Sequence, residues 1–138
     1  MGMHEDYGKQ VLREAAGDAY CDWGAGVEVD YGTGRPARID GTVASLIAVE
    51  IESRVPKQVR GAVLDLICHP HTKKLLTLMP VYMTDVDTTA DQCRFILGQF
   101  IDPAHFRVVV LRGAGEESRL NDDVSAVKTA LSELGFSV

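Results

Sequence analysis

The sequence predicts an α/β domain in which helices cover both faces of a mixed β-sheet. Three strand-like segments follow one another in the first half of the chain, and later strands alternate with amphipathic helices, in the order α-β-β-β-α-β-α-β-α. Residues 106–111 are nearly all apolar and β-branched, which is typical of a strand buried on both faces. With 138 residues, 46% of them hydrophobic, the chain can bury a core, so we expect one domain over residues 1–138.

The first half of the chain contains one predicted helix and three predicted strands. Residues 4–19 place apolar side chains at helical spacing. Residues 27–31 alternate apolar and acidic side chains, which predicts a strand with one wet face, and residues 32–36 predict a turn because they are rich in glycine and proline. Residues 37–43 and 47–52 are two further strands, close enough in sequence to form a hairpin.

The second half of the chain alternates helices and strands. Residues 56–68 repeat apolar side chains at helical spacing, and Pro56 is tolerated because it falls in the first turn. Residues 74–79 predict a strand, and residues 90–101 predict a helix before the apolar strand at 106–111.

The last predicted helix is marked at both ends. Asn121 is its expected N-cap, because a short polar side chain there can accept a hydrogen bond from a free backbone N–H. Asp122 and Asp123 follow at the positive end of the helix dipole. Gly135 comes just past the last apolar residue, where helices often end in a left-handed conformation.

Composition argues against several classes of protein. A net charge of −6 disfavours a protein that coats nucleic acid through overall basicity. Cys21, Cys68 and Cys93 are widely spaced and odd in number, which fits reduced, buried thiols better than a disulfide framework or a zinc site. We interpret His69 and His71, which flank a proline, as a helix end and not as zinc ligands.

No apolar run approaches the roughly 20 residues of a membrane span, and the N-terminal residues lack a secretory signal, so we expect a cytoplasmic protein.

Three carboxylates gather on one face of the predicted hairpin. Because strand side chains alternate, Glu50 and Glu52 share a face, about 6 to 7 Å apart along the strand. A three-residue loop, residues 44–46, would set Asp40 opposite Glu50 and Arg38 opposite Glu52, with the polar side chains together. A two-residue loop would mix charged and apolar side chains on both faces, so the hydrophobic pattern favours the longer loop.

The pairing of Asp40 with Glu50 predicts a divalent metal site. Two carboxylates directly opposite each other on antiparallel strands repel unless a proton or a cation lies between them. Hard cations such as Mg²⁺ prefer oxygen ligands and are often held by one or two carboxylates plus water. The alternative is a solvated polar face on which Arg38 bridges to Glu52.

These residues resemble the PD-(D/E)XK nuclease superfamily, which has the restriction endonuclease-like fold. Its signature is an acidic residue on one strand of a hairpin, then an acidic residue and usually a lysine, one residue apart, on the next strand. Here Arg38-Ile39-Asp40-Gly41 matches the first half and Val49-Glu50-Ile51-Glu52 the second, and the element order matches over residues 4–80. Ile39 replaces the usual proline, and Glu52 replaces the usual lysine, which resembles the Glu-x-Glu variant of some restriction endonucleases.

The resemblance implies a Mg²⁺-dependent endonuclease that hydrolyses the phosphodiester bonds of DNA, with Mn²⁺ as an alternative ion. By the same resemblance, Asp40, Glu50 and the backbone carbonyl of Ile51 hold the ion. Glu52 orients or deprotonates the attacking water.

Further residues are expected around this site. Many members of the superfamily add a glutamate from the first helix, for which Glu14 is the best-placed residue here, and Lys57 is a nearby cation that can replace the missing lysine. Arg54, Lys57 and Arg60 recur at intervals of three, so on a helix they drift only slowly around one side and can contact DNA phosphates, together with Arg38 from the hairpin. The alternative interpretation of these cations is a solvated helix face.

Partners and competing functions follow from size and charge. A chain this short lacks a separate recognition domain, so we expect a homodimer or a partner subunit to help embrace a DNA duplex. Because the usual lysine is missing and the charge is acidic, a second hypothesis is a non-catalytic nuclease-fold module that binds nucleic acid or a protein partner. A third is a structural interaction protein whose acidic face is merely solvated.

Overall fold

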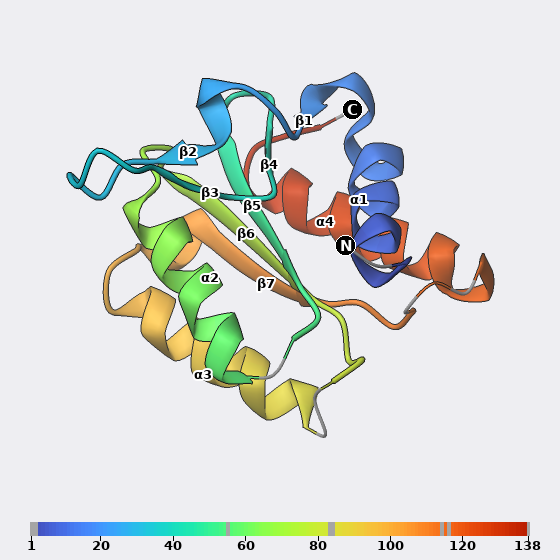
Figure 1. Ribbon diagram of the computed structural model, residues 1–138. Coiled ribbons are helices and arrows are strands. Elements are labelled where there is room, and N and C mark those ends of the chain that lie inside the picture. Colours follow the sequence, from blue (N-terminus) through green and yellow to red (C-terminus); the bar gives the residue numbers. More distant parts are fainter. Residues whose placement is uncertain (1–2, 55, 83–84, 114, 116, 138) are drawn as a thin grey trace.

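A mixed β-sheet forms the middle layer of the computed structural model, which describes residues 3–54, 56–82, 85–113, 115 and 117–137 (Figure 1). Within these residues five strands pair in the order β1-β4-β5-β6-β7. They are β1 (Tyr20–Cys21), β4 (Gly41–Val43), β5 (Ile47–Glu52), β6 (Lys73–Leu78) and β7 (Phe106–Val110). The β1, β4 and β5 neighbours are antiparallel, and β5, β6 and β7 are parallel. A separate antiparallel pair is formed by β2 (Glu28–Val29) and β3 (Ala37–Arg38).

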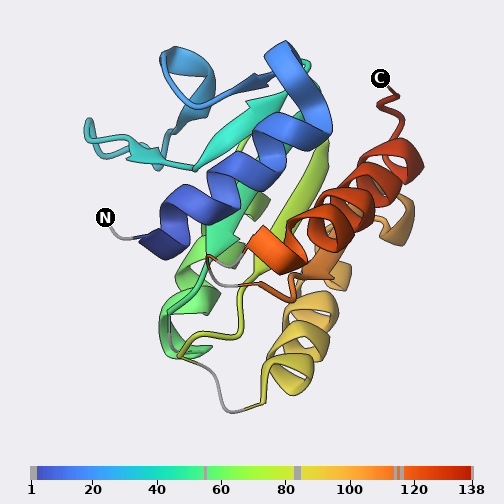
Figure 2. The ribbon, with the colours of Figure 1, turned by 90° about the vertical axis from the view of Figure 1, so that its right-hand side faces the viewer.

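Helices cover both faces of the sheet, as the sequence predicts. On one face lie α1 (Met3–Ala16) and α4 (Leu120–Glu133), and on the other lie α2 (Pro56–Cys68) and α3 (Val86–Gly98). Figure 2 shows α1 and α4 side by side across their face of the sheet. Short 3₁₀ turns connect the elements: Gly17–Ala19, Ala25–Val27, Pro103–His105 and Glu117–Arg119. None of the described helices is both long and apolar enough to cross a bilayer.

Two hydrophobic clusters fill the spaces between the layers. Alternation along β5 sends Ile47, Val49 and Ile51 into the cluster under α1 and α4, and Ala48 into the cluster under α2 and α3. All six residues of β5 are buried, including Glu50 and Glu52. Since Glu50 and Glu52 alternate with the isoleucines and valine, they lie on the α2 face of the sheet.

The segment predicted as one strand over residues 37–43 is broken at Ile39 and Asp40. Its first part, β3, pairs with β2 outside the main sheet, and its second part, β4, pairs with β5. The break follows from Ile39, whose side chain is buried in the α2-side cluster and whose N–H bonds to the carbonyl of Val27 at 2.9 Å. The strand predicted at 27–31 is also shorter in the structure. Val27 belongs to the 3₁₀ turn Ala25–Val27, so β2 begins only at Glu28.

The two-residue strand β1 is not evident in the sequence, because two residues show no alternation. The helix predicted at 90–101 begins earlier, at Val86, where Asp85 serves as the N-cap and its Oδ1 accepts from the N–H of Thr88 at 3.1 Å. The full burial predicted for residues 106–111 holds only in part, since β7 lies at the end of the described strand order and several of its residues are half-buried.

The N-cap predicted at Asn121 is wrong. The α4 helix begins at Leu120, with Arg119 in the capping position, because a 3₁₀ turn leads directly into it. The acidic first turn is confirmed, but Asp123 points inward: its carboxylate accepts from the N–H groups of Arg112 and Gly113 at 2.7 and 2.9 Å. Gly135 follows the end of α4 with φ +100°, as predicted.

Candidate functional site

The hairpin register sets the geometry of the site. The pairs Val43–Ile47, Thr42–Ala48 and Gly41–Val49 face each other, so the loop between β4 and β5 has three residues, 44–46, as predicted. Ala44 and Ser45 adopt left-handed conformations to close this loop, with φ of 56° and 52°.

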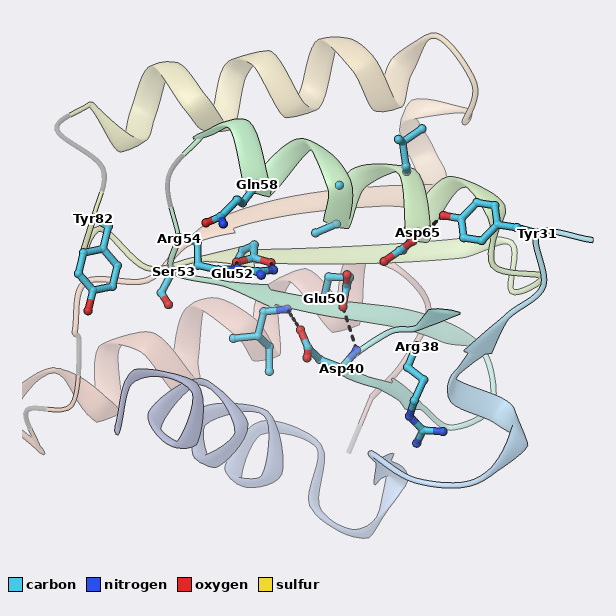
Figure 3. A pocket seen from close by; sticks show the side chains of 14 residues that line it. Tyr31, Arg38, Asp40, Glu50, Glu52, Ser53, Arg54, Gln58, Asp65 and Tyr82 are labelled. Carbon is cyan, nitrogen blue, oxygen red and sulfur yellow. Dashed lines mark hydrogen bonds and ion pairs between the residues drawn. The ribbon is translucent and has the colours of Figure 1, made fainter. Parts of the chain in front are cut away.

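Asp40 and Glu50 follow next along this register, and each carboxylate accepts a hydrogen bond from a backbone N–H of the facing segment. The N–H of Asp40 donates to Glu50 Oε1 at 2.9 Å and to the carbonyl of Val49 at 3.1 Å. In return, the N–H of Ile51 donates to Asp40 Oδ2 at 2.7 Å (Figure 3). The two carboxylates are therefore fixed beside one another by main-chain donors from both strands.

This arrangement raises the pKa of Glu50 to about 10. Burial is the largest cause, followed by the charge of Asp40 and a hydrogen bond with it. From the sequence, such a pair is expected to require a proton or a cation between its members, and the raised pKa of Glu50 agrees with that expectation.

Close packing on the α1 side of the sheet positions the pair. The hydroxyl of Tyr20 donates to the backbone carbonyl of Asp40 at 2.8 Å. The Tyr20 ring lies so near that a Cβ at Gly41 would overlap with its Cε1. In the same cluster, a Cβ at Gly8 of α1 would overlap with Cγ2 of Ile51. Glycine is thus required at positions 41 and 8 for Asp40 and Ile51 to occupy their places.

Glu52 is bound by an arginine, but not by the predicted one. Its side chain is 4% exposed, and both carboxylate oxygens accept from Arg54, with Nε 2.7 Å from Oε1 and Nη2 against Oε2. Arg38 does not lie opposite Glu52 as predicted. It faces Glu28 in the β2–β3 pair, where its Nη1 is 3.8 Å from Glu28 Oε2, because the strand breaks at Asp40.

A cleft of about 1080 Å³ opens over these residues between β5, α2 and the β2–β3 pair. Figure 3 shows Tyr31 and Tyr82 at its two ends and the carboxylates between them. Four carboxyl groups and two guanidinium groups line the cleft, so its lining is predominantly acidic. The lining residues are Tyr31, Arg38, Asp40, Glu50, Ile51, Glu52, Ser53, Arg54, Gln58, Gly61, Ala62, Leu64, Asp65 and Tyr82.

Three predicted site residues lie outside this cleft. Glu14 is exposed on α1 and accepts from Gln10 Nε2 at 3.0 Å. Lys57 is exposed in the first turn of α2 and does not line the cleft. Arg60 lines a separate groove with Phe95 of α3. The structure thus brings together Asp40, Glu50, Ile51, Glu52, Arg38 and Arg54, and leaves Glu14, Lys57 and Arg60 apart.

Few groups in the cleft could act as ligands for a metal ion. Across the described parts of the chain, no three His, Cys, Asp or Glu side chains are arranged as a metal-binding group. Glu52 is bound by Arg54 and Asp65 accepts from Tyr31, which leaves the carboxylates of Asp40 and Glu50, with Ile51 beside them in the cleft wall. Two carboxylates completed by water match the way proteins commonly bind Mg²⁺.

Several residues that line the cleft were not predicted from the sequence, among them Tyr31, Asp65 and Tyr82. The hydroxyl of Tyr31 donates to Asp65 Oδ1 at 2.5 Å, and burial together with Asp65 raises the pKa of Tyr31 above its usual value. A signal for Asp65 exists, since Gln58 and Asp65 are seven residues apart on the predicted helix and share one face. Tyr82 follows β6 and carries no such signal.

No protein-family model matches this chain, and no curated protein or solved structure gives a match either.

Proposed function

We propose that this protein is a metal-dependent endonuclease that hydrolyses phosphodiester bonds in DNA, with a restriction endonuclease-like fold of the PD-(D/E)XK type. The observation that carries the proposal is the reciprocal pair of Asp40 and Glu50, two carboxylates held together in a cleft by main-chain donors. Asp40 directly precedes β4, Glu50 lies on β5 of the same hairpin, and Glu52 follows two residues later, which supports the resemblance in sequence.

The residues present fit a hard divalent cation. A cation between Asp40 and Glu50 would relieve the repulsion between the two carboxylates, which contributes to the raised pKa of Glu50. Asp40, Glu50 and the carbonyl of Ile51 would hold Mg²⁺, or Mn²⁺ in its place. When bound, the ion would supply positive charge that stabilises the phosphate oxygens and makes a water molecule easier to deprotonate.

The remaining cleft residues would orient the substrate and move the proton. Glu52 would accept the proton of the attacking water, as the Glu-x-Glu pattern implies. For this step Arg54 must release Glu52, and a DNA phosphate in the cleft is a natural new partner for its guanidinium group. Arg38 lines the same cleft and would contact a neighbouring phosphate. A homodimer or a partner subunit would complete the DNA-binding surface.

A cleavage panel tests this proposal. Supercoiled, linear, branched and single-stranded DNA are incubated with Mg²⁺ or Mn²⁺ and with wild type, Glu50→Gln or Glu133→Gln. Glu133 is an exposed α4 residue that pairs with Arg107, so its variant controls for loss of a surface carboxylate. We expect cleavage by wild type and Glu133→Gln, and a loss of about 100-fold or more in Glu50→Gln. Equal cleavage by wild type and Glu50→Gln would overturn the proposal.

A second candidate function is a nuclease-fold module that binds nucleic acid or a protein without cutting. The observation that favours it is the engagement of both Glu52 oxygens by Arg54, which leaves no free base beside the Asp40–Glu50 pair. In that case metal and DNA would bind, and every substrate of the panel would stay intact.

A further inference from the structure

Lys74 is a buried cation with one acceptor. Its side chain lies under the C-terminal end of α2, only 2% exposed, and its Nζ donates to the carbonyl of His69 at 2.6 Å. An ammonium group has three N–H donors, and in the described part of the chain no carboxylate lies within ion-pair distance of this one. Buried charges are normally paired, yet two of the three donors of Lys74 have no acceptor among the described residues.

Two imidazoles share a surface groove with Lys74. His71 and His105 line this groove, whose volume is about 270 Å³, and neither ring makes a hydrogen bond with another described residue. His69 also lines it, but its ring is occupied: Nε2 is 2.7 Å from the carbonyl of Gly26, and Nδ1 accepts from the N–H of His71 at 3.1 Å. His69 therefore fixes the segment that carries His71.

Lys74 is the cation of the groove, and Asp102 is the carboxylate that lines it. Burial lowers the pKa of Lys74 to about 8, and burial together with Lys74 lowers the pKa of His71. Asp102 lines the groove too, but its Oδ1 accepts from the N–H of Ala104 at 2.8 Å. Cys68 is the further titratable group that acts on Lys74. A bound anion would pair with the Lys74 ammonium, whose charged form burial disfavours, and neutral imidazoles can donate an N–H to the same anion.

We propose that this groove is a binding site for a phosphate-class oxyanion, held by Lys74, His71 and His105. A volume of about 270 Å³ has room for such an anion with several waters, since a water molecule occupies about 30 Å³. The site is separate from the carboxylate cleft. Lys74 pairs with Ala48 and Leu76 pairs with Glu50, so Lys74 lies about 7 Å along the strands from the level of Glu50. The groove and the cleft share no lining residue, and this proposal stands independently of nuclease activity.

The test is a titration with inorganic phosphate, against sodium chloride at matched ionic strength. The melting temperature and the NMR signals of the His71 and His105 rings are followed in wild type, Lys74→Met and Lys73→Met. Lys73 is a matched control, because its Nζ also donates to a carbonyl near a helix end, that of Leu134 at 2.6 Å. We expect saturable shifts in wild type and Lys73→Met, and binding weakened about tenfold or more in Lys74→Met.

His71→Asn serves as a second variant in case Lys74→Met does not fold, and we expect it to weaken phosphate binding about threefold or more. A 5′-phosphorylated oligonucleotide and its unphosphorylated counterpart distinguish the source of the ligand: a response to the phosphorylated form alone assigns the groove to terminal phosphates. A phosphate effect no larger than that of chloride, or unchanged binding in His71→Asn and in folded Lys74→Met, would overturn the proposal.

Discussion

Asp40 and Glu50 are linked across the β4–β5 hairpin by two backbone donors: Oε1 of Glu50 accepts from the N–H of Asp40, and Oδ2 of Asp40 accepts from the N–H of Ile51, the residue after Glu50. Each carboxylate is thus aligned by the backbone next to the other, not by a flexible side chain. The preorganised pair needs little rearrangement to accept a cation, and its placement depends on the tight packing around it.

Gly41→Ala is expected to disturb the pair through packing. The new Cβ would overlap with the Tyr20 ring, and Tyr20 also bonds to the carbonyl of Asp40. We expect a loss of about 1 to 3 kcal/mol in the free energy of unfolding, measured by urea denaturation. Gly61→Ala is the control, since a Cβ at that position would have no atom within 4 Å and alanine favours the interior of α2. Equal stabilities of the two variants would contradict this interpretation of Gly41.

Asp123→Ala should be among the more destabilising single substitutions. The buried carboxylate accepts from the hydroxyl of Tyr7 at 2.6 Å and from the N–H groups of Arg112 and Gly113. Removing it leaves these donors without an acceptor, at a cost of about 3 kcal/mol in the free energy of unfolding. Asp122→Ala, one residue earlier and exposed, should cost less than about 1 kcal/mol. Chemical denaturation of both variants measures the two losses in the free energy of unfolding. A small loss in Asp123→Ala would refute the anchoring role of Asp123.

Arg54→Ala separates substrate contact from metal binding. Under the proposed mechanism Arg54 moves from Glu52 to a DNA phosphate, so its loss should lower cleavage about 100-fold and leave the affinity for Mg²⁺ within about threefold. Arg13→Ala is the control: the Arg13 side chain is 55% exposed and pairs with Asp22, against 58% for Arg54. Cleavage kinetics and calorimetry measure the two effects. Cleavage unaffected by Arg54→Ala would exclude this role.

The free energy of unfolding should change with pH because Lys74 has a lower pKa in the folded protein than in the unfolded chain. Its pKa is about 8 in the folded protein and 10.5 when unperturbed, so between these values the unfolded chain holds more protons. The contribution of Lys74 to stability is therefore least favourable below pH 8 and improves as pH rises toward 10.5, by up to about 1 kcal/mol per pH unit. Urea denaturation of wild type and Lys74→Met in phosphate-free buffer measures the difference between the two proteins. A difference that stays constant from about pH 7 to pH 10 would be inconsistent with a buried charge at Lys74.

Local patterns predicted the centre of the candidate site. Alternation along β5 was enough to put Glu50 and Glu52 on one face, and the hydrophobic register was enough to select the three-residue loop that brings Asp40 to Glu50. The α2 boundaries at Pro56 and Cys68 also followed from spacing and from the helix-ending proline.

Long-range contacts decided what the sequence could not predict. Arg38 does not lie opposite Glu52, because burial of Ile39 breaks the strand that was predicted to carry it. That burial depends on residues of distant elements. Arg54 reaches Glu52 only because of the path of the chain after β5, which no periodicity encodes. Glu14 satisfied a family pattern in sequence, yet it is exposed to solvent on α1.

Direct Mn²⁺ binding tests the central claim that Asp40 and Glu50 form a divalent metal site. After removal of metal with a chelator, free Mn²⁺ is measured by electron paramagnetic resonance during titration of wild type, Asp40→Asn, Glu50→Gln and Glu133→Gln. We expect one ion bound per chain in wild type and Glu133→Gln, and loss of that binding in each of the two cleft variants. Binding that survives in both Asp40→Asn and Glu50→Gln, or no binding by the wild type, would contradict the account.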